Sequence, residues 1–159
     1  HWNNLGGYYA YQYISNYISK FYPSIKTRNI DDFILKKEET NIPGGLGEVL
    51  ALTEYDDVEY LLTPKVPYSY VHMSGSDSEK KPQVYRTGSK NLPNAIIFRD
   101  SFMEAVEPYL SDDFNFVVYL DLWKQWGVLE DIDLLITEIQ PNIVIEERVE
   151  RHLLPSVRF

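Results

Sequence analysis

Hydrophobic positions in the first part of the chain repeat with the period of a helix. Between Asn3 and Pro23, aromatic residues return at every fourth position, so we predict an amphipathic helix that ends near Tyr22. Because aromatic residues at this spacing usually pack against a core, we expect the stripe to be buried. Tyr8 and Tyr11 lie on other faces and are the candidates for exposure. The stripe consists of Tyr9, Tyr13, Tyr17 and Phe21, with Ile14 and Ile18 beside them.

The middle of the chain contains shorter apolar segments. Residues 30–35 have the pattern of a short strand, and residues 44–55 that of a loop followed by a short helix. Three strand-like pieces then occupy much of residues 58–90, interrupted by the polar run 74–81. We interpret 58–90 as a β-hairpin insertion and the polar run as a solvent-exposed loop without a binding motif.

The last third of the chain alternates buried strands with helices. Continuous apolar runs of strand length occupy residues 95–98, 114–122 and 142–147. Helical spacing occurs between them, at residues 101–110 and 131–140, and a final helix is predicted over residues 147–154, ending at Pro155. This alternation predicts an α/β fold in which helices cover both faces of a parallel sheet.

Composition and charge narrow the classes of function. The 159 residues, 44% of them hydrophobic, suffice for one core, so we treat residues 1–159 as a single domain. A formal net charge of −9 leaves no basic surface for a phosphate backbone, and we expect no nucleic-acid partner. The absence of cysteine excludes disulfides and thiolate metal sites. No apolar run reaches the roughly 20 residues of a membrane-spanning helix.

Ser101 lies between the apolar run 95–98 and a helical segment, and two interpretations are open. The local pattern favours a helix cap, because a serine side chain commonly satisfies a free backbone N–H at a strand-to-helix junction. Its position in the predicted sheet favours a nucleophile, because ligands bind beyond the carboxyl ends of parallel strands. Backbone amides and the positive end of the helix would there stabilise an oxyanion.

A serine nucleophile needs a base, and the chain has three histidines. His72 lies in a predicted strand and His152 near the end of the final helix, positions that favour structural roles. His1 precedes the loop that leads into the first helix. Because the chain begins at His1 and Trp2 without an initiator methionine, we expect it to be a piece of a longer protein.

Four segments resemble the alginate O-acetyltransferase AlgX/AlgJ-like proteins and their DHHW relatives, in the SGNH hydrolase superfamily. "HWNNLGGYYAYQYI" at residues 1–14 resembles their D-x-H-W-N-x-x-G-x-x-x-x-Y stretch, and "GGLGEVLAL" at 44–52 their loop and helix. "IIFRDSFMEAVEPYLSDDF" at 96–114 resembles the strand, D-S-F turn and helix of that family. "PNIVIEERVER" at 141–151 resembles its closing strand and helix.

The resemblance implies a fold and a catalytic pair. The fold would be a three-layer α/β/α domain of SGNH type with a mainly parallel sheet and a β-hairpin insertion. Ser101 would be the nucleophile and His1 the general base. The orienting aspartate of the family stands two positions before that histidine, so we expect it upstream of this chain.

Four further residues are candidates for substrate binding. Trp2 is a candidate stacking wall for a sugar ring, against the alternative of a buried indole. Arg99 is a candidate ligand for a sugar hydroxyl or an anion, although a salt-bridged arginine is commoner. Asp100 is expected to bond backbone groups of the turn, with catalysis the minority alternative. Asn3 is a candidate hydrogen-bond donor, although a helix cap at Asn3 or Asn4 is the simpler expectation.

The resemblance implies O-acetylation of an exported or cell-surface polysaccharide through an acetyl-serine. It implies an extracytoplasmic location, with anchoring through a missing N-terminal segment, and a membrane-bound acyltransferase as the donor partner. We expect no metal and no cofactor. Two alternatives stay open: a carbohydrate esterase, and a non-catalytic polysaccharide-binding or scaffolding domain.

Overall fold

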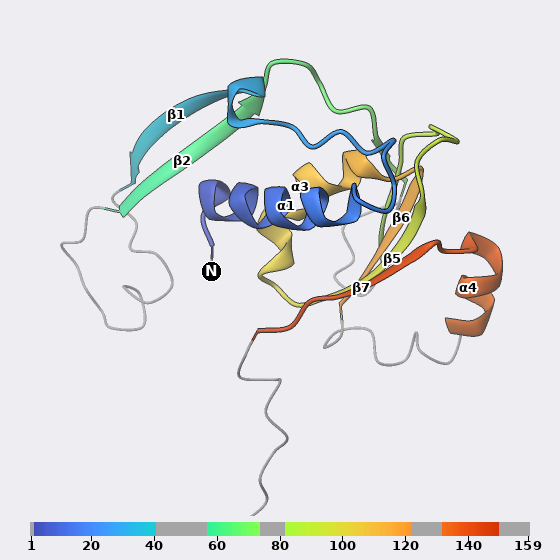
Figure 1. Ribbon diagram of the computed structural model, residues 1–159. Coiled ribbons are helices and arrows are strands. Elements are labelled where there is room, and N and C mark those ends of the chain that lie inside the picture. The colour runs from blue at the N-terminus through green and yellow to red at the C-terminus, as the bar shows by residue number, and fades with distance from the viewer. Residues whose placement is uncertain (1, 41–56, 74–81, 122–131, 150–159) are drawn as a thin grey trace, which may run out of the picture.

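The computed structural model describes residues 2–40, 57–73, 82–121 and 132–149 (Figure 1). Five strands form a mixed sheet in the order β3-β4-β6-β5-β7. β5, β6 and β7 are parallel, whereas β4 runs antiparallel to β6 and β3 antiparallel to β4. The bounds are Val71–His72 for β3, Gln83–Arg86 for β4, Asn94–Arg99 for β5, Phe116–Asp121 for β6 and Ile143–Glu146 for β7.

A second sheet consists of two antiparallel strands, β1 (Phe33–Thr40) and β2 (Asp57–Pro64), paired along their whole lengths. β1 begins three residues later than the sequence predicts, because Ile30–Asp32 forms a 3-10 turn, η1. The strands of residues 58–90 are therefore divided between two sheets. β2 pairs with β1, while β3 and β4 extend the larger sheet and make it mixed.

Two of the predicted helices are present, and two differ from the prediction within the described residues. α1 covers Asn4–Ile18 and α4 covers Ile132–Ile139. The helix predicted at 101–110 is broken into the 3-10 turn η2 (Met103–Ala105), the short α3 (Glu107–Leu110) and the 3-10 turn η3 (Ser111–Asp113). The helix expected within 44–55 lies outside the described residues. The final predicted helix is absent from residues 147–149, and its remainder also lies outside.

The central strands β5 and β6 are buried on both faces, and their successive side chains point to opposite sides of the sheet. Ala95 and Ile97 of β5 pack with Tyr8 and Tyr11 of α1 and with the η2–α3 segment. The neighbouring Ile96 faces the other way, into a smaller cluster with α4. Within the described part of the chain, no helix is long and apolar enough to cross a membrane.

The predicted buried stripe of α1 is wrong, and the opposite face is the core. The four aromatic residues of the stripe, Tyr9, Tyr13, Tyr17 and Phe21, are between 57 and 78% exposed. The buried residues of the helix are Gly7, Tyr8, Tyr11, Ser15 and Ile18.

Gly7 explains which face of α1 is buried. A Cβ atom at this position would lie 2.2 Å from the carbonyl oxygen of Ala105, so only glycine lets α1 approach η2 this closely. The buried tyrosines also find polar partners, since the Tyr8 hydroxyl donates to the Arg28 carbonyl and the Tyr11 hydroxyl accepts the Arg28 N–H. Both rings can therefore be buried without an unsatisfied hydroxyl.

Candidate functional site

Ser101 lies at the carboxyl end of β5, between the strand and η2, and it is exposed. β5 is flanked by the parallel strands β6 and β7, so the turn occupies the sheet edge at which α/β proteins commonly bind ligands. The helical segment that follows is only a 3-10 turn and a four-residue helix. A strong helix dipole, which the sequence suggested, is therefore not available to Ser101.

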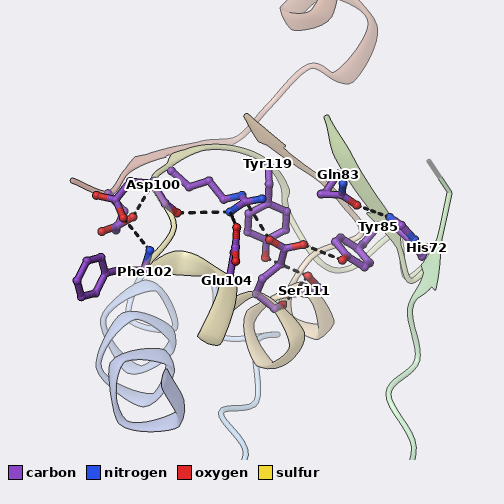
Figure 2. Close-up of polar contacts among 11 residues, drawn as sticks. His72, Gln83, Tyr85, Asp100, Phe102, Glu104, Ser111 and Tyr119 are labelled. Carbon is purple, nitrogen blue, oxygen red and sulfur yellow. Dashed lines mark hydrogen bonds and ion pairs between the residues drawn. The ribbon is translucent and has the colours of Figure 1, made fainter. Parts of the chain in front are cut away.

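Asp100 shapes the turn that carries Ser101. Its Oδ1 accepts the Phe102 N–H at 2.8 Å (Figure 2). Its Oδ2 accepts the Val149 N–H at 2.7 Å. The Met103 N–H donates to the Asp100 carbonyl at 3.3 Å. Both carboxylate oxygens thus bind backbone groups, which fixes the turn and ties it to the segment after β7.

Glu147 completes this tie, and sequence reasoning did not identify it. Its Oε2 accepts the Asp100 N–H at 3.0 Å, and its own N–H donates to the Phe98 carbonyl at 2.9 Å. Burial raises the pKa of Glu147, and the neighbouring Asp100 charge raises it further, while the Asp100 N–H opposes the shift. The predicted topology could have identified this contact, because Asp100 follows β5, Glu147 follows β7, and the carboxyl ends of neighbouring parallel strands meet at one edge of the sheet.

Arg99 is buried beneath the turn and forms salt bridges. Its Nη1 lies 3.2 Å from Glu104 Oε1, and its Nε lies 3.5 Å from Glu107 Oε2. Alternation along β5 places Arg99 on the same face as Ala95 and Ile97, the face that η2 and α3 cover. The guanidinium therefore links the end of β5 to α3. Arg99 is thus a salt-bridged arginine, the commoner of the two expected roles.

Glu107 joins Arg99 to a chain of polar groups that runs from the core to the exposed His72 (Figure 2). The Tyr85 hydroxyl donates to Glu107 Oε1 at 2.7 Å, and the His72 ring stacks on Tyr85 with centroids 4.7 Å apart. Burial raises the pKa of Glu107, whereas the Arg99 charge and the Tyr85 hydroxyl oppose this shift. Ser111 extends the chain, since its hydroxyl donates to the Glu107 carbonyl and lies 3.0 Å from the Tyr119 hydroxyl.

The start of the chain lies beside the Ser101 turn. The Trp2 ring meets the Phe102 ring edge-on, with centroids 5.7 Å apart, and Trp2 is 44% exposed. Asn3 is the N-cap of α1, with its side chain accepting the Gly6 N–H at 2.9 Å. His1 lies outside the described residues, so its position relative to Ser101 stays a prediction.

Of the other two histidines, only His72 lies within the described residues. His72 is exposed on β3, and its Nε2 lies 2.7 Å from Gln83 Oε1. His152 lies outside the described residues. Among the residues that are described, no group of three or more histidine, aspartate or glutamate side chains could hold a metal ion.

The fold is similar to that of solved bacterial proteins. The structure of Bacillus cereus PatB1 with a sulfonyl adduct matches with a TM-score of 0.74 and 19% identity, over 98% of this chain and 60% of that one. A second PatB1 structure matches with a TM-score of 0.71 and 18% identity, over 98% and 62% of the two chains. A DHHW family protein from Eubacterium siraeum matches with a TM-score of 0.65 and 15% identity, over 92% and 55%.

The chain has the fold of these proteins. At 15 to 19% identity the similarity shows the fold alone. The chain spans between 55 and 62% of the length of these three structures. No family model matches the sequence, and no curated protein matches it significantly.

Proposed function

We propose that the protein is an O-acetyltransferase that uses Ser101 as its nucleophile. The observation that carries the proposal is the placement of an exposed serine at the carboxyl end of β5, next to the start of the chain. Trp2 contacts Phe102, and one peptide bond joins Trp2 to His1 and Phe102 to Ser101. The likeness in fold to PatB1 and to a DHHW family protein supports the same assignment.

The proposed reaction has two steps that share one base. His1 takes the proton from Ser101, the hydroxyl oxygen attacks the acetyl carbonyl, and the donor's leaving group departs with that proton. A sugar hydroxyl then loses its proton to His1 and attacks the acetyl-serine, and Ser101 regains a proton. An aspartate upstream of His1 would hold the imidazole in its working tautomer.

The oxyanion of each step needs N–H donors. The amides of Phe102 and Met103 already donate to Asp100, so they hold the turn in shape. The oxyanion donors are therefore groups other than these two amides.

The substrate and setting follow from the resemblance of the sequence segments. We propose an exported or cell-surface polysaccharide as acceptor and a membrane-bound acyltransferase as the source of acetyl groups. An extracytoplasmic location belongs to the same proposal. The exposed Trp2 ring beside the Ser101 turn supports an acceptor with a sugar ring, because such rings stack on aromatic faces.

The first test is the Ser101→Ala variant of the full-length protein. With an activated aryl acetate, the variant should lose turnover while its thermal stability falls by no more than about 1 kcal/mol, the cost of a lost cap at an exposed position. A sulfonylating reagent should label the wild-type peptide that contains Ser101. Ser69→Ala, at another exposed serine, is the control. Unchanged turnover in Ser101→Ala would show that another group reacts.

The second test separates the transferase from the esterase. A transferase orients a sugar hydroxyl at the acyl-enzyme, and such orientation can lower the barrier by about 7 kcal/mol in favourable cases. Increasing concentrations of oligosaccharide should therefore yield acetylated sugar by mass spectrometry and reduce the release of free acetate. Removal of acetyl groups from an acetylated glycan, with no transfer to any acceptor, would favour the esterase. Glycan binding without turnover would favour the scaffolding domain.

A further inference from the structure

A polar cavity lies at the end of the sheet opposite Ser101. Its volume is about 550 Å³, and seven of its eight lining residues are polar, among them Lys26, Asn91 and Asp113. Asn91 precedes β5 and Asp113 precedes β6, so the cavity lies at the amino ends of two parallel strands. Ser101 follows the carboxyl end of β5, which puts roughly 20 Å of strand between the two places.

Asp113 is the lining residue of this cavity that has a buried side-chain oxygen without a hydrogen bond to the described part of the chain. It is 4% exposed, and its Oδ2 has no hydrogen-bond partner among the described residues. Burial raises the pKa of Asp113 to about 7, and Asp112 raises it too, while the Ser15 hydroxyl and Arg28 oppose the shift. A buried acceptor without a partner costs about 1–3 kcal/mol, so a donor that enters the cavity would recover free energy here.

The other charges of the cavity determine what kind of donor fits. Arg28 donates to the Val66 and Pro67 carbonyls and forms a 2.7 Å salt bridge with Asp112. Lys26 uses one ammonium hydrogen on the Pro23 carbonyl, which leaves two for another acceptor. Two cations and two acids balance one another, so neither an anion nor a cation is favoured overall.

A saccharide matches this set of groups. Each sugar hydroxyl can both donate and accept, so one hydroxyl can donate to Asp113 while another accepts from Lys26. Exposed hydroxyl and amide side chains of Ser24, Ser89 and Asn91 add further partners. Asp113 lines the cavity, and because the carboxylate torsion of an aspartate is broad, a rotation that exposes Oδ2 at the cavity wall is the adjustment that binding requires. A volume of about 550 Å³ also lies within the range of small-molecule sites.

We propose that this cavity binds one or two units of a neutral saccharide, with Asp113, Lys26 and Asn91 as the main hydrogen-bonding residues. The site is separate from Ser101 and needs no acetyl transfer. A glycan held there would be tethered to the protein away from the reacting turn, which raises its effective concentration at Ser101.

The test is a titration of the intact protein with maltotetraose, cellotetraose and chitotetraose. Calorimetry and NMR measure the binding. Binding of at least one saccharide is expected, and Asn91→Ala should weaken it about tenfold, the effect of one lost hydrogen bond to a polar ligand group. Asp113→Asn should weaken it by a similar factor. Asp133→Asn, an exposed acid on α4, is the control and should bind like wild type.

A second readout distinguishes a direct role of Asp113 from a structural one. A hydroxyl that donates to the carboxylate favours its charged form, so saccharide should lower the pKa of Asp113 measured by NMR. Ser101→Ala should bind the saccharide unchanged, which separates this proposal from the catalytic one. The proposal is overturned if none of the three saccharides binds at millimolar concentration, or if binding is indifferent to both Asn91→Ala and Asp113→Asn. Binding of inorganic phosphate or ethanolamine in place of every saccharide would overturn it as well.

Discussion

Glu107 and Asp113 are both buried carboxylates on the segment between β5 and β6, but their surroundings differ. Glu107 lies against the Arg99 guanidinium and accepts the Tyr85 hydroxyl at 2.7 Å. Asp113 has an oxygen without a partner among the described residues and lies at a polar cavity. Burial raises the pKa of both acids, and only at Glu107 does a buried cation in contact oppose that effect.

The difference indicates how the two ends of the sheet are built. At the Ser101 end, Glu107 contacts the Arg99 guanidinium and accepts the Tyr85 hydroxyl, which holds β5 against α3, although Arg99 Nε makes no hydrogen bond among the described residues. At the opposite end, the unsatisfied Asp113 lowers stability and leaves a position that a ligand can fill. Polar groups are therefore used for rigidity at one end and remain available for binding at the other.

Glu107→Ala should have the largest effect on stability. It would leave the Arg99 guanidinium buried without its carboxylate, and breaking a buried ion pair from one side costs about 3–5 kcal/mol. The matched control is Glu104→Ala, which removes the more exposed partner of the same arginine and should cost about 0–1 kcal/mol. Urea unfolding of both variants measures the difference. Equal small losses would show that the buried pair is not what stabilises this end.

Asp113→Asn should raise the free energy of unfolding at neutral and alkaline pH, whereas Glu107→Ala should lower it. The folded pKa of about 7 lies above the usual value of 3.8, so this group stabilises the fold fully below pH 4 and that contribution is lost as pH rises through 7. The variant removes this loss and should be more stable than wild type at pH 8 by about 1–3 kcal/mol. Thermal unfolding between pH 4 and 8 gives the difference curve, with Asp133→Asn as the control. A difference that does not change over this range contradicts the assignment.

The strands and α4 could be predicted from the sequence because their signals are local. β5, β6 and β7 are continuous apolar runs of strand length, and α4 has a clear helical period between two of them. The buried face of α1 could not be predicted in this way, because aromatic residues occur on both sides of the helix. The face is decided by Gly7, whose contact with Ala105 depends on a fold that brings residues 98 positions apart together.

The candidate site also has one part that the sequence predicts and another that only the fold shows. The strand-turn-helix pattern was enough to put Ser101 at the carboxyl end of a parallel strand. The ties from Glu147 to Asp100 depend on the alignment of β5 with β7, and the burial of Asp113 depends on packing around η3. The sequence does not show which of the adjacent acids Asp112 and Asp113 is buried. Neither feature could therefore be predicted before the fold was known.

The smallest effect should come from Tyr85→Phe, which tests how much of the stability at the Ser101 end is due to a single hydrogen bond. The ring keeps its packing against Tyr119 and Tyr70, so only the hydroxyl that donates to Glu107 is lost. A hydrogen bond to a charged group contributes about 1.5–3 kcal/mol, and retention of the Arg99 contact puts the expected loss near the lower limit. Tyr13→Phe, at an exposed hydroxyl, should leave the free energy of unfolding unchanged. If Tyr85→Phe is also neutral, Arg99 alone accounts for the burial of Glu107, and the contrast with Asp113 reduces to the presence of one cation.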